Sequence, residues 1–324
     1  MDSPETILKT IKAGKRILIP MHLRPDGDMI GSALALNQFL KSLGKSVTIT
    51  SVDPLPNDLA FPPGSKQVER RDPANMDLGK FDILLLADNG DSRRYSRSQD
   101  LNLPSQLLVI NIDHHDSNYG FGDLNYVNQK AASTGEIIYE LFKKWRVKIT
   151  PTIADCLLLA IYTDTGGFLN PKTSADSLAA AADLVKKGGN REKIVDKAFW
   201  GWSPKAQAAW AVILKNVRMR KGISYSQISK EELKKSGCTL TELSAAKGFA
   251  ANSLMLSAER AKAAVIFVEE APRKVRVNLR SKGKFNVGRI AKSFGGGGHF
   301  NSAAFDYDGP LKEAVAKTIR VMAR

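Results

Sequence analysis

Four short apolar runs alternate with longer segments of helical spacing in the first part of the chain. They are "RILIPM" at 16–21, "VTITSV" at 47–52, "FDILLLAD" at 81–88 and "QLLVINID" at 106–113. Continuous apolar runs of this length are typical of strands that are buried on both faces. Strand, helix and strand in this rhythm predict an α/β fold in which helices cover a parallel sheet.

The segments between and after these runs have the spacing of helices. Residues 29–44 carry apolar side chains at helical intervals and end at Gly44, a favourable C-terminal stop. Three more helices are expected over residues 133–145, 152–164 and 174–189. The first of these opens with Ser133 or Thr134 and Glu136, a capping signature that supports the assignment.

The charge balance differs between the two parts of the chain. Residues 1–190 contain 22 Lys and Arg against 22 Asp and Glu, whereas residues 191–324 contain 26 against 11, a net charge of +15. Such an excess is either a solubilising surface or a face that attracts a nucleotide or nucleic acid. Because the composition changes around residues 186–204, we expect a first domain over 1–190, a linker helix region over 191–215 and a second domain over 216–324.

The second domain has the pattern of a small mixed α/β unit. A hairpin-like pair over 263–281 precedes a helical segment at 286–294, the glycine-rich stretch "GGGGHFNSAAF" at 295–305 and a terminal helix. No apolar stretch in the sequence approaches the roughly 18 residues of a membrane span. The first 20 residues also lack the features of a secretory signal, so we expect a cytoplasmic protein.

Side chains that bind metals follow three of the predicted strands. They are His22, Asp26 and Asp28 after the first, Asp88 at the end of the third, and Asp113, His114 and His115 at the end of the fourth. The carboxyl ends of parallel strands share one edge of a sheet, so these residues should converge. Each aspartate taken alone is an ordinary turn or cap residue, and it is their joint occurrence at strand ends that indicates a site.

Mixed imidazole and carboxylate ligands suit manganese, zinc, iron or cobalt better than calcium, which prefers oxygen alone. The set is too large for one ion, and it predicts two ions bridged by a carboxylate, as in two-metal phosphoryl-transfer sites. Asp164 is a further candidate ligand, since the helical pattern of "AIYTDTGGF" breaks directly after it.

These motifs resemble those of the DHH phosphoesterase superfamily, which is named for the Asp-His-His stretch. The matching segments are "HLRPDGDMIGS", "LLLADNGDSRR", "VINIDHHDSN", "LLLAIYTDTGGF" and "NLRSKGKFNVGRIAKSFGGGGHFNSAAF". The last is similar to the glycine-rich motif of the DHH-associated substrate domain. In its length and its pair of domains, the chain is most similar to the branch of oligoribonucleases and 3'-phosphoadenosine-5'-phosphate phosphatases called nanoRNases.

The resemblance implies a role for each matched residue. His22 and Asp26 would hold one manganese ion, Asp28, His114 and Asp164 the other, and Asp88 would bridge the two. His115 would face the scissile phosphate, and Asp113 would orient a histidine. The candidate contacts to substrate are Arg280, Ser281, Gly296, Gly297, Gly298 and His299, where the glycines would present a concave run of N–H donors.

Several alternatives stay open at this point. The substrate could be short RNA, 3'-phosphoadenosine 5'-phosphate, or a linear or cyclic dinucleotide such as pApA or cyclic di-AMP. A pyrophosphatase is disfavoured because its second domain lacks the glycine-rich, histidine-ended motif. A protein that only binds nucleotides is the rival from another class, although every matched ligand position is filled. The sequence leaves cleavage polarity and oligomeric state, a homodimer included, undetermined.

Overall fold

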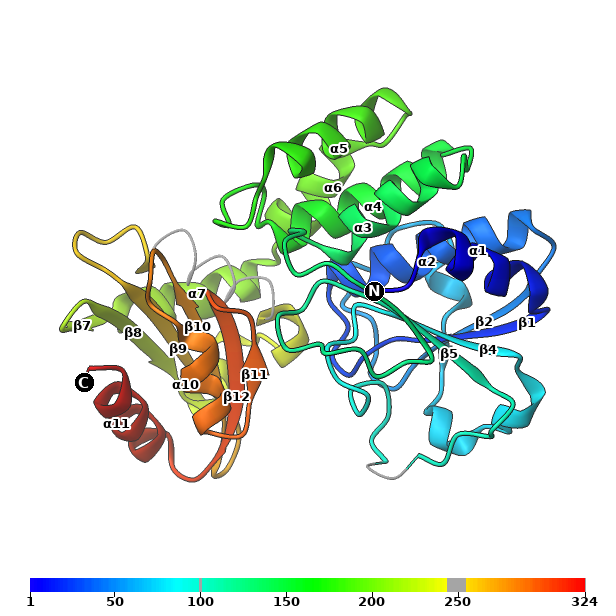
Figure 1. Ribbon diagram of the computed structural model, residues 1–324. Helices are drawn as coiled ribbons and strands as arrows, with labels where there is room; N and C mark the ends of the chain where they lie inside the picture. Colours follow the sequence, from blue (N-terminus) through cyan, green and yellow to red (C-terminus); the bar gives the residue numbers. More distant parts are fainter. Residues whose placement is uncertain (99–100, 244–254, 324) are drawn as a thin grey trace. The chain divides into compact units, whose positions relative to one another are not determined.

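The computed structural model describes residues 1–98, 101–243 and 255–323. The chain divides into two compact units, Met1–Ala198 and Phe199–Arg324, and each is described by itself. Each unit is built on a six-stranded sheet (Figure 1).

The sheet of the first unit is parallel throughout, with the strand order β3-β2-β1-β4-β5-β6. Its strands are β1 Arg16–Pro20, β2 Ser46–Ser51, β3 Glu69–Arg70, β4 Ile83–Ala87, β5 Leu108–Asp113 and β6 Leu124–Val127. The chain adds β2 and β3 on one side of β1, and then returns to add β4, β5 and β6 on the other side. In open parallel sheets, ligands bind at the carboxyl ends of the strands where this order reverses, which here is between β1 and β4.

The helices of the first unit form two layers beside this sheet (Figure 1). Helices α2 and α3 contact its strands, and α4 packs against both helices from further out. Because helices surround α4, its buried residues run around nearly its whole circumference. The helices are α1 Pro4–Ala13, α2 Gly27–Ser42, α3 Thr134–Lys144, α4 Pro151–Asp164, α5 Ala175–Lys186 and α6 Arg191–Val195.

Two glycines allow helices α2, α3 and α4 to approach one another closely. A Cβ atom on Gly31 of α2 would lie 2.3 Å from the carbonyl oxygen of Cys156 in α4. A Cβ atom on Gly135 of α3 would lie 2.4 Å from Cβ of Ala160, also in α4. Real Cβ atoms do not approach so closely, so larger side chains would force the helices apart.

The opposite side of the first core is closed by irregular segments rather than helices. Leu18, Leu84 and Leu86 of the central strands pack there against Leu78 and Tyr95. The short 3₁₀ turns Pro73–Asn75 and Leu78–Lys80 supply part of this cover, and Ser65–Gln67 forms a third such turn.

The sheet of the second unit is mixed, with the order β11-β12-β10-β9-β8-β7. Strands β8 and β9 are parallel, and the other neighbours are antiparallel. The strands are β7 Arg218–Arg220, β8 Ile223–Ile228, β9 Ala263–Ala271, β10 Lys274–Ser281, β11 Gly297–Gly298 and β12 Ser302–Asp308. The helices are α7 Pro204–Lys215, α8 Lys230–Ser236, α10 Val287–Ser293 and α11 Leu311–Met322.

Alternate residues of β9 face two separate cores. Val265 and Phe267 point to the side that α10 and α11 cover, whereas Ile266 packs with α7 and α8 on the other side. Helix α7 falls within the region that the sequence suggested as a linker over 191–215. Ala206 and Ile213 lie on its apolar face and bury it in the second core, so this helix is an integral part of the second unit.

The predicted α/β fold is confirmed, including the four strands β1, β2, β4 and β5 and the hairpin of β9 and β10, although only the second half of β2 is buried. The predicted helices correspond to α2, α3, α4, α5, α10 and α11. Ser133 is the N-cap of α3, where its side chain accepts a hydrogen bond from the N–H of Glu136. No helix within the described part of the chain is both long and apolar enough to cross a membrane.

Candidate metal centre

The candidate ligands of the first unit meet at the carboxyl edge of its sheet, beside the point where the strand order reverses. His22 lies two residues beyond β1, Asp88 directly follows β4, and His114 directly follows β5. Asp26 is the N-cap of α2, Asp28 lies in the first turn of that helix, and Asp164 is the last residue of α4. Strand ends and helix ends therefore bring six side chains from five segments to one place.

The Asp88 carboxylate lies at the centre of this cluster. Its Oδ2 is 3.4 Å from Nε2 of His22, and its Oδ1 is 3.5 Å from Nε2 of His114. The residue is 2% exposed, and Thr134 Oγ1 donates a hydrogen bond of 3.1 Å to its Oδ1. Its backbone has a φ of 54°, in the left-handed region that aspartate tolerates better than most L-residues. One carboxylate thus presents a different oxygen to each of two histidines.

The first group of ligands consists of His22, Asp26 and Asp88. Nδ1 of His22 lies 2.9 Å from the carbonyl oxygen of Leu23, a contact that places the ring proton on Nδ1. The lone pair of Nε2 therefore points to the carboxylates, with Asp26 Oδ1 at 3.8 Å. Nε2 is buried and has no hydrogen-bond partner among the described residues.

The second group consists of Asp28, Asp88 and His114, with Asp164 beside them. Nε2 of His114 lies 3.7 Å from Asp28 Oδ2 and 3.4 Å from Asp164 Oδ2. Nδ1 of the same ring is 3.3 Å from the carbonyl oxygen of Ala131, so this imidazole too directs Nε2 toward the carboxylates.

Asp28 is held by the start of helix α3. The backbone N–H groups of Thr134 and Gly135 donate to its Oδ2 and Oδ1 at 2.7 and 2.9 Å. Ser32 Oγ donates to Oδ1 at 3.2 Å from the next turn of α2. These hydrogen bonds hold the Asp28 carboxylate in one orientation at the N-terminus of α3.

The donor set fits divalent cations. The separations of 3.4–3.8 Å between imidazole nitrogen and carboxylate oxygen exceed those of ordinary N–H···O hydrogen bonds. Two ligand atoms about 2.1 Å from one ion, at angles of about 90–109°, lie about 3.0–3.4 Å apart, only slightly closer than observed. The four carboxylates of Asp26, Asp28, Asp88 and Asp164, with two neutral imidazoles, also balance the charge of two divalent ions.

The carboxylates of the cluster lie close enough to shift the pKa values of one another. Burial raises the pKa of Asp28 well above its usual range, and the negative charge of Asp88 adds to the rise. Burial likewise raises the pKa of Asp164 to about 6. For Asp88 burial acts in the same direction, but His114 and His22 outweigh it and hold the pKa of this carboxyl well below its usual range.

His22 shows the complementary effect. Burial and the nearby charge of Arg94 lower its pKa, but Asp26 and Asp88 act more strongly and raise it to about 9. A buried cluster that raises some carboxyl pKa values and draws protons onto its histidines has an excess of negative charge, which bound cations would neutralise.

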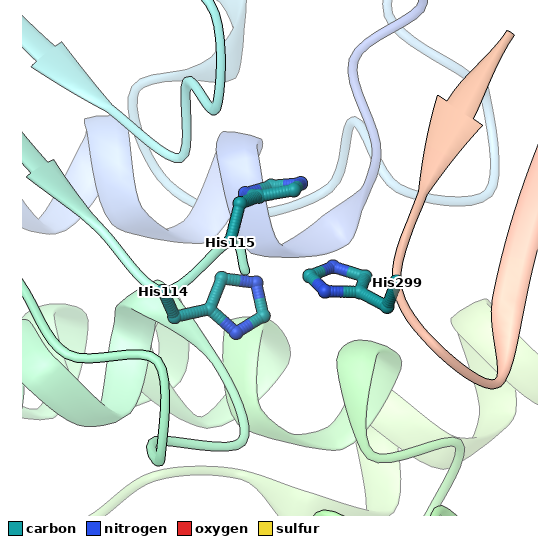
Figure 2. Close-up of side chains that lie close together, drawn as sticks. All are labelled: His114, His115 and His299. Carbon is teal, nitrogen blue, oxygen red and sulfur yellow. The ribbon is translucent and has the colours of Figure 1, made fainter. Parts of the chain in front are cut away.

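Asp113, His115 and Asn118 form a hydrogen-bonded chain that adjoins the cluster, since Nδ1 of His115 also lies 3.6 Å from Oδ1 of Asp88. Asp113 Oδ1 lies 2.7 Å from Nδ1 of His115, and Asn118 Nδ2 donates to Asp113 Oδ2 at 2.7 Å. Figure 2 shows His114 and His115 on consecutive residues, and their ring centroids are 4.9 Å apart at an interplanar angle of 71°. His114 thus joins the ligand cluster, whereas Nδ1 of His115 faces the carboxylate of Asp113.

The candidate substrate contacts lie in the second unit. Arg280 and Ser281 end strand β10, and His299, which Figure 2 also draws, directly follows β11. Gly297 and Gly298 form β11 and pair with β12. The sequence predicted that the N–H of Gly296 would be available to the substrate. It instead donates a hydrogen bond of 2.9 Å to the carbonyl oxygen of Ala291 at the end of α10. Gly296 is required sterically, since a Cβ atom there would lie 2.3 Å from the carbonyl oxygen of Ala304.

Comparison with known proteins agrees with this architecture. The family model described as "DHH family, N-terminal domain" matches residues 16–161, and that of the "DHHA1 domain" matches residues 240–323. The chain is 30% identical over 302 residues to a probable bifunctional oligoribonuclease and PAP phosphatase of Streptococcus mutans, covering 92% of each protein. The chain belongs to the DHH family.

Two further proteins are similar to this chain over nearly its whole length. The bifunctional oligoribonuclease and PAP phosphatase of Bacillus subtilis is 28% identical over 303 residues, covering 90% of each protein. The crystal structure of an exopolyphosphatase-related protein from Bacteroides fragilis superposes with a TM-score of 0.87 at 26% identity, covering 99% of this chain and 95% of the other.

Sequence reasoning missed several residues that shape this DHH centre. Thr134 and Gly135 contact Asp28 or Asp88, yet the sequence identified their segment only as a helix start. Asn118 ends the quoted motif "VINIDHHDSN", and its position five residues after Asp113 was the available signal. The sequence also left open which histidine Asp113 orients, and the structure pairs it with His115.

Proposed function

We propose that this DHH-family chain hydrolyses short oligoribonucleotides to 5'-mononucleotides and also removes phosphate from 3'-phosphoadenosine 5'-phosphate. The observation that carries the proposal is the Asp88 carboxylate, whose two oxygens face His22 and His114. A shared carboxylate between two groups of ligands is the arrangement of two-metal phosphoryl-transfer enzymes. The relatives from Bacillus subtilis and Streptococcus mutans are named for these two activities, which supports the choice of substrate.

We assign two divalent ions, most simply manganese, to the centre. His22 and Asp26 would hold one, Asp28, His114 and Asp164 the other, with Asp88 contacting both. When bound, such ions supply positive charge to the phosphoester group and lower the pKa of water. Mixed imidazole and carboxylate ligands are consistent with manganese and disfavour calcium. All of these side chains come from one chain, so the proposal needs no second copy.

His115 is the residue that we assign to the reacting phosphate. Its Nδ1 is occupied by Asp113, whose other oxygen is held by Asn118. This fixes the ring orientation and directs Nε2 away from Asp113. Protonated Nε2 would donate a hydrogen bond to an oxygen of the phosphoryl group, where negative charge accumulates during hydrolysis.

The second unit supplies the proposed contacts to the rest of the substrate. The guanidinium of Arg280 and the imidazole of His299 are suited to a terminal phosphate, and Ser281 lies next to Arg280 at the end of the same strand. Gly297 and Gly298 would let a nucleotide approach the backbone, whereas the N–H of Gly296 is already used within the fold. The net charge of +15 over residues 191–324 would attract an anionic substrate.

The test is hydrolysis of a panel by the purified protein with and without manganese. The panel contains RNA of two to five nucleotides, pApA, cyclic di-AMP, 3'-phosphoadenosine 5'-phosphate and pyrophosphate, with Asp88→Ala as the inactive control. We expect mononucleotides from short RNA and phosphate from 3'-phosphoadenosine 5'-phosphate. Activity on pyrophosphate alone would refute the assignment of the second unit, and no activity on any substrate would favour a nucleotide-binding protein.

A further inference from the structure

A hollow of about 600 Å³ opens in the first unit beside the loop that follows β5. Tyr119 lines it together with Asn118, Val127, Asn128, Gln129 and Lys130. It is not part of the ligand cluster, and nothing in the mechanism so far uses it. It is linked to the centre through Asn118, which lines the hollow and also belongs to the hydrogen-bonded chain through Asp113 to His115.

Tyr119 is 89% exposed, whereas the preceding Asn118 is 3% exposed. Exposing an aromatic ring so fully forgoes the free energy that its burial would contribute. Single exposed aromatic residues are common on protein surfaces, so exposure alone does not indicate a site. Tyr119 differs from such residues because hydrogen bonds hold the backbone before and after it.

Three hydrogen bonds fix that backbone. The N–H of Asn118 donates to the carbonyl oxygen of His115 at 3.1 Å, and the N–H of Gly120 donates to Asn118 Oδ1 at 2.9 Å. Gln129 Nε2 donates to the carbonyl oxygen of Asn118 at 3.4 Å. The structure therefore presents the tyrosine from a restrained turn that begins at His115, the residue assigned to the phosphate.

The chemistry of the hollow suits a nucleobase next to a phosphate. A planar base stacks on an exposed tyrosine, whichever base it is. Lys130 is exposed on the rim, and its ammonium group has no ion-pair partner among the described residues, so it can meet a phosphodiester. The carboxylate of Asp2, also on the rim, is already used as an acceptor for the N–H of Asn125.

We propose that Tyr119 forms a stacking subsite for the second nucleobase of a short RNA. This inference rests on the proposed function, since only an oligonucleotide brings a second base to the centre. It makes Tyr119 a determinant of preference for oligonucleotides over a substrate with one base, such as 3'-phosphoadenosine 5'-phosphate.

The first arm of the test compares kcat/KM for 3'-phosphoadenosine 5'-phosphate, pApA and a trinucleotide. Tyr119→Ala should lower kcat/KM for the two oligonucleotides by about 5- to 30-fold and leave the single-base substrate within about 2-fold. Tyr119→Phe keeps the ring and should match the wild type on all three. Leu178→Ala, at an exposed position of α5, controls for an unrelated surface change. An equal fall on all three substrates, or none on any, overturns the inference.

The second arm does not depend on turnover. A non-hydrolysable phosphonate analogue of the dinucleotide carries 2-aminopurine, whose fluorescence is quenched by stacking, as either its first or its second base. We expect Tyr119→Ala to abolish the quenching of one labelled position, the second, and Tyr119→Phe to retain it. Quenching that is absent in the wild type, or unchanged in Tyr119→Ala, contradicts the stacking subsite. If hydrolysis fails on every substrate while this quenching is observed, the proposed reaction is wrong and the subsite stands.

Discussion

The metal centre of the first unit and the glycine-rich segment of the second differ in burial and in the charge of the part of the chain that contains them. In the first unit, Asp28 and Asp88 are buried and each accepts hydrogen bonds from the start of α3. In the second unit, Gly297 and Gly298 are exposed on a short edge strand of a strongly basic part of the chain. Rigid buried carboxylates suit the binding of cations, whereas an exposed basic surface suits the binding of a variable anionic substrate. This difference supports the proposal that the first unit holds the catalytic centre and the second unit binds the rest of the substrate.

The largest effect should come from Asp88, because both ligand groups share it. Asp88→Asn removes the charge that would join the two ions, and we expect hydrolysis to fall by at least about a thousandfold. Manganese titration by calorimetry should show fewer bound ions than in the wild type. Asp82→Asn is the matched control, since Asp82 precedes the same strand at its opposite end and pairs with Arg16. An Asp88→Asn variant that keeps wild-type activity would remove the basis of the proposed centre.

Gly135→Ala should weaken both the packing of α3 and the binding of manganese in the first unit. The added Cβ atom would clash with Ala160 and displace the N–H groups that hold Asp28. We expect about 1–3 kcal/mol lower free energy of unfolding and about 10- to 100-fold weaker binding of manganese.

Gly296→Ala provides the matching change in the second unit. It should destabilise that unit by a similar clash with Ala304, yet leave manganese affinity unchanged. Urea unfolding combined with calorimetry distinguishes the two variants. Equal losses of manganese affinity in both would show that the two regions are not separable in this way.

Arg280→Ala should affect recognition more than chemistry. Loss of a charged contact to phosphate is expected to raise KM about 10-fold or more while kcat changes little. The dependence of kcat/KM on salt concentration should also become weaker, since one cation that meets the substrate is gone. A fall in kcat at constant KM would instead place Arg280 in the chemical step.

The smallest effect concerns the ion pair of Asp82 and Arg16 at the far end of β4. The Arg16 side chain, with the N–H groups of Lys15 and Arg16, lowers the pKa of Asp82 to about 2. A lowered folded pKa stabilises the protein above the unfolded value of about 3.9, and this contribution disappears as the pH falls toward 2. Asp82→Asn should therefore lower Tm by about 1–3 °C at pH 7 and have a much smaller effect at pH 2, with activity unchanged. A Tm difference as large at pH 2 as at pH 7 would assign the effect to packing instead of charge.

Strands β1, β4 and β5 were predictable because each contains an apolar run, and β2 was predictable because it is rich in β-branched residues. Strands β3 and β6 were not, since β3 has two residues and the side chains of β6 are only partly buried. Their pairing with β2 and β5 depends on where the chain returns in space, and no local pattern encodes that. Helix α1 was also missed, although Ser3 caps it and Pro4 begins it.

The convergence of the candidate ligands was predictable because strand ends in a parallel sheet share one edge. Their role as ligands stays a prediction, as do the substrate contacts of the second unit. The hydrogen bonds from Thr134 and Gly135 to Asp28 could not be foreseen, because they join residues 106 and 107 positions apart through the packing of α3 on α2. The use of the Gly296 N–H by Ala291 likewise follows from the end of α10, which a run of four glycines does not reveal.

The central claim is that one carboxylate, Asp88, is shared by two metal ions. Anomalous diffraction at the manganese absorption edge, from crystals grown with manganese, tests it most directly. We predict two anomalous peaks about 3.5–4 Å apart, one beside His22 and Asp26 and the other beside Asp28, His114 and Asp164, with Asp88 contacting both. A single peak, or two peaks of which only one is within bonding distance of Asp88, would contradict the account.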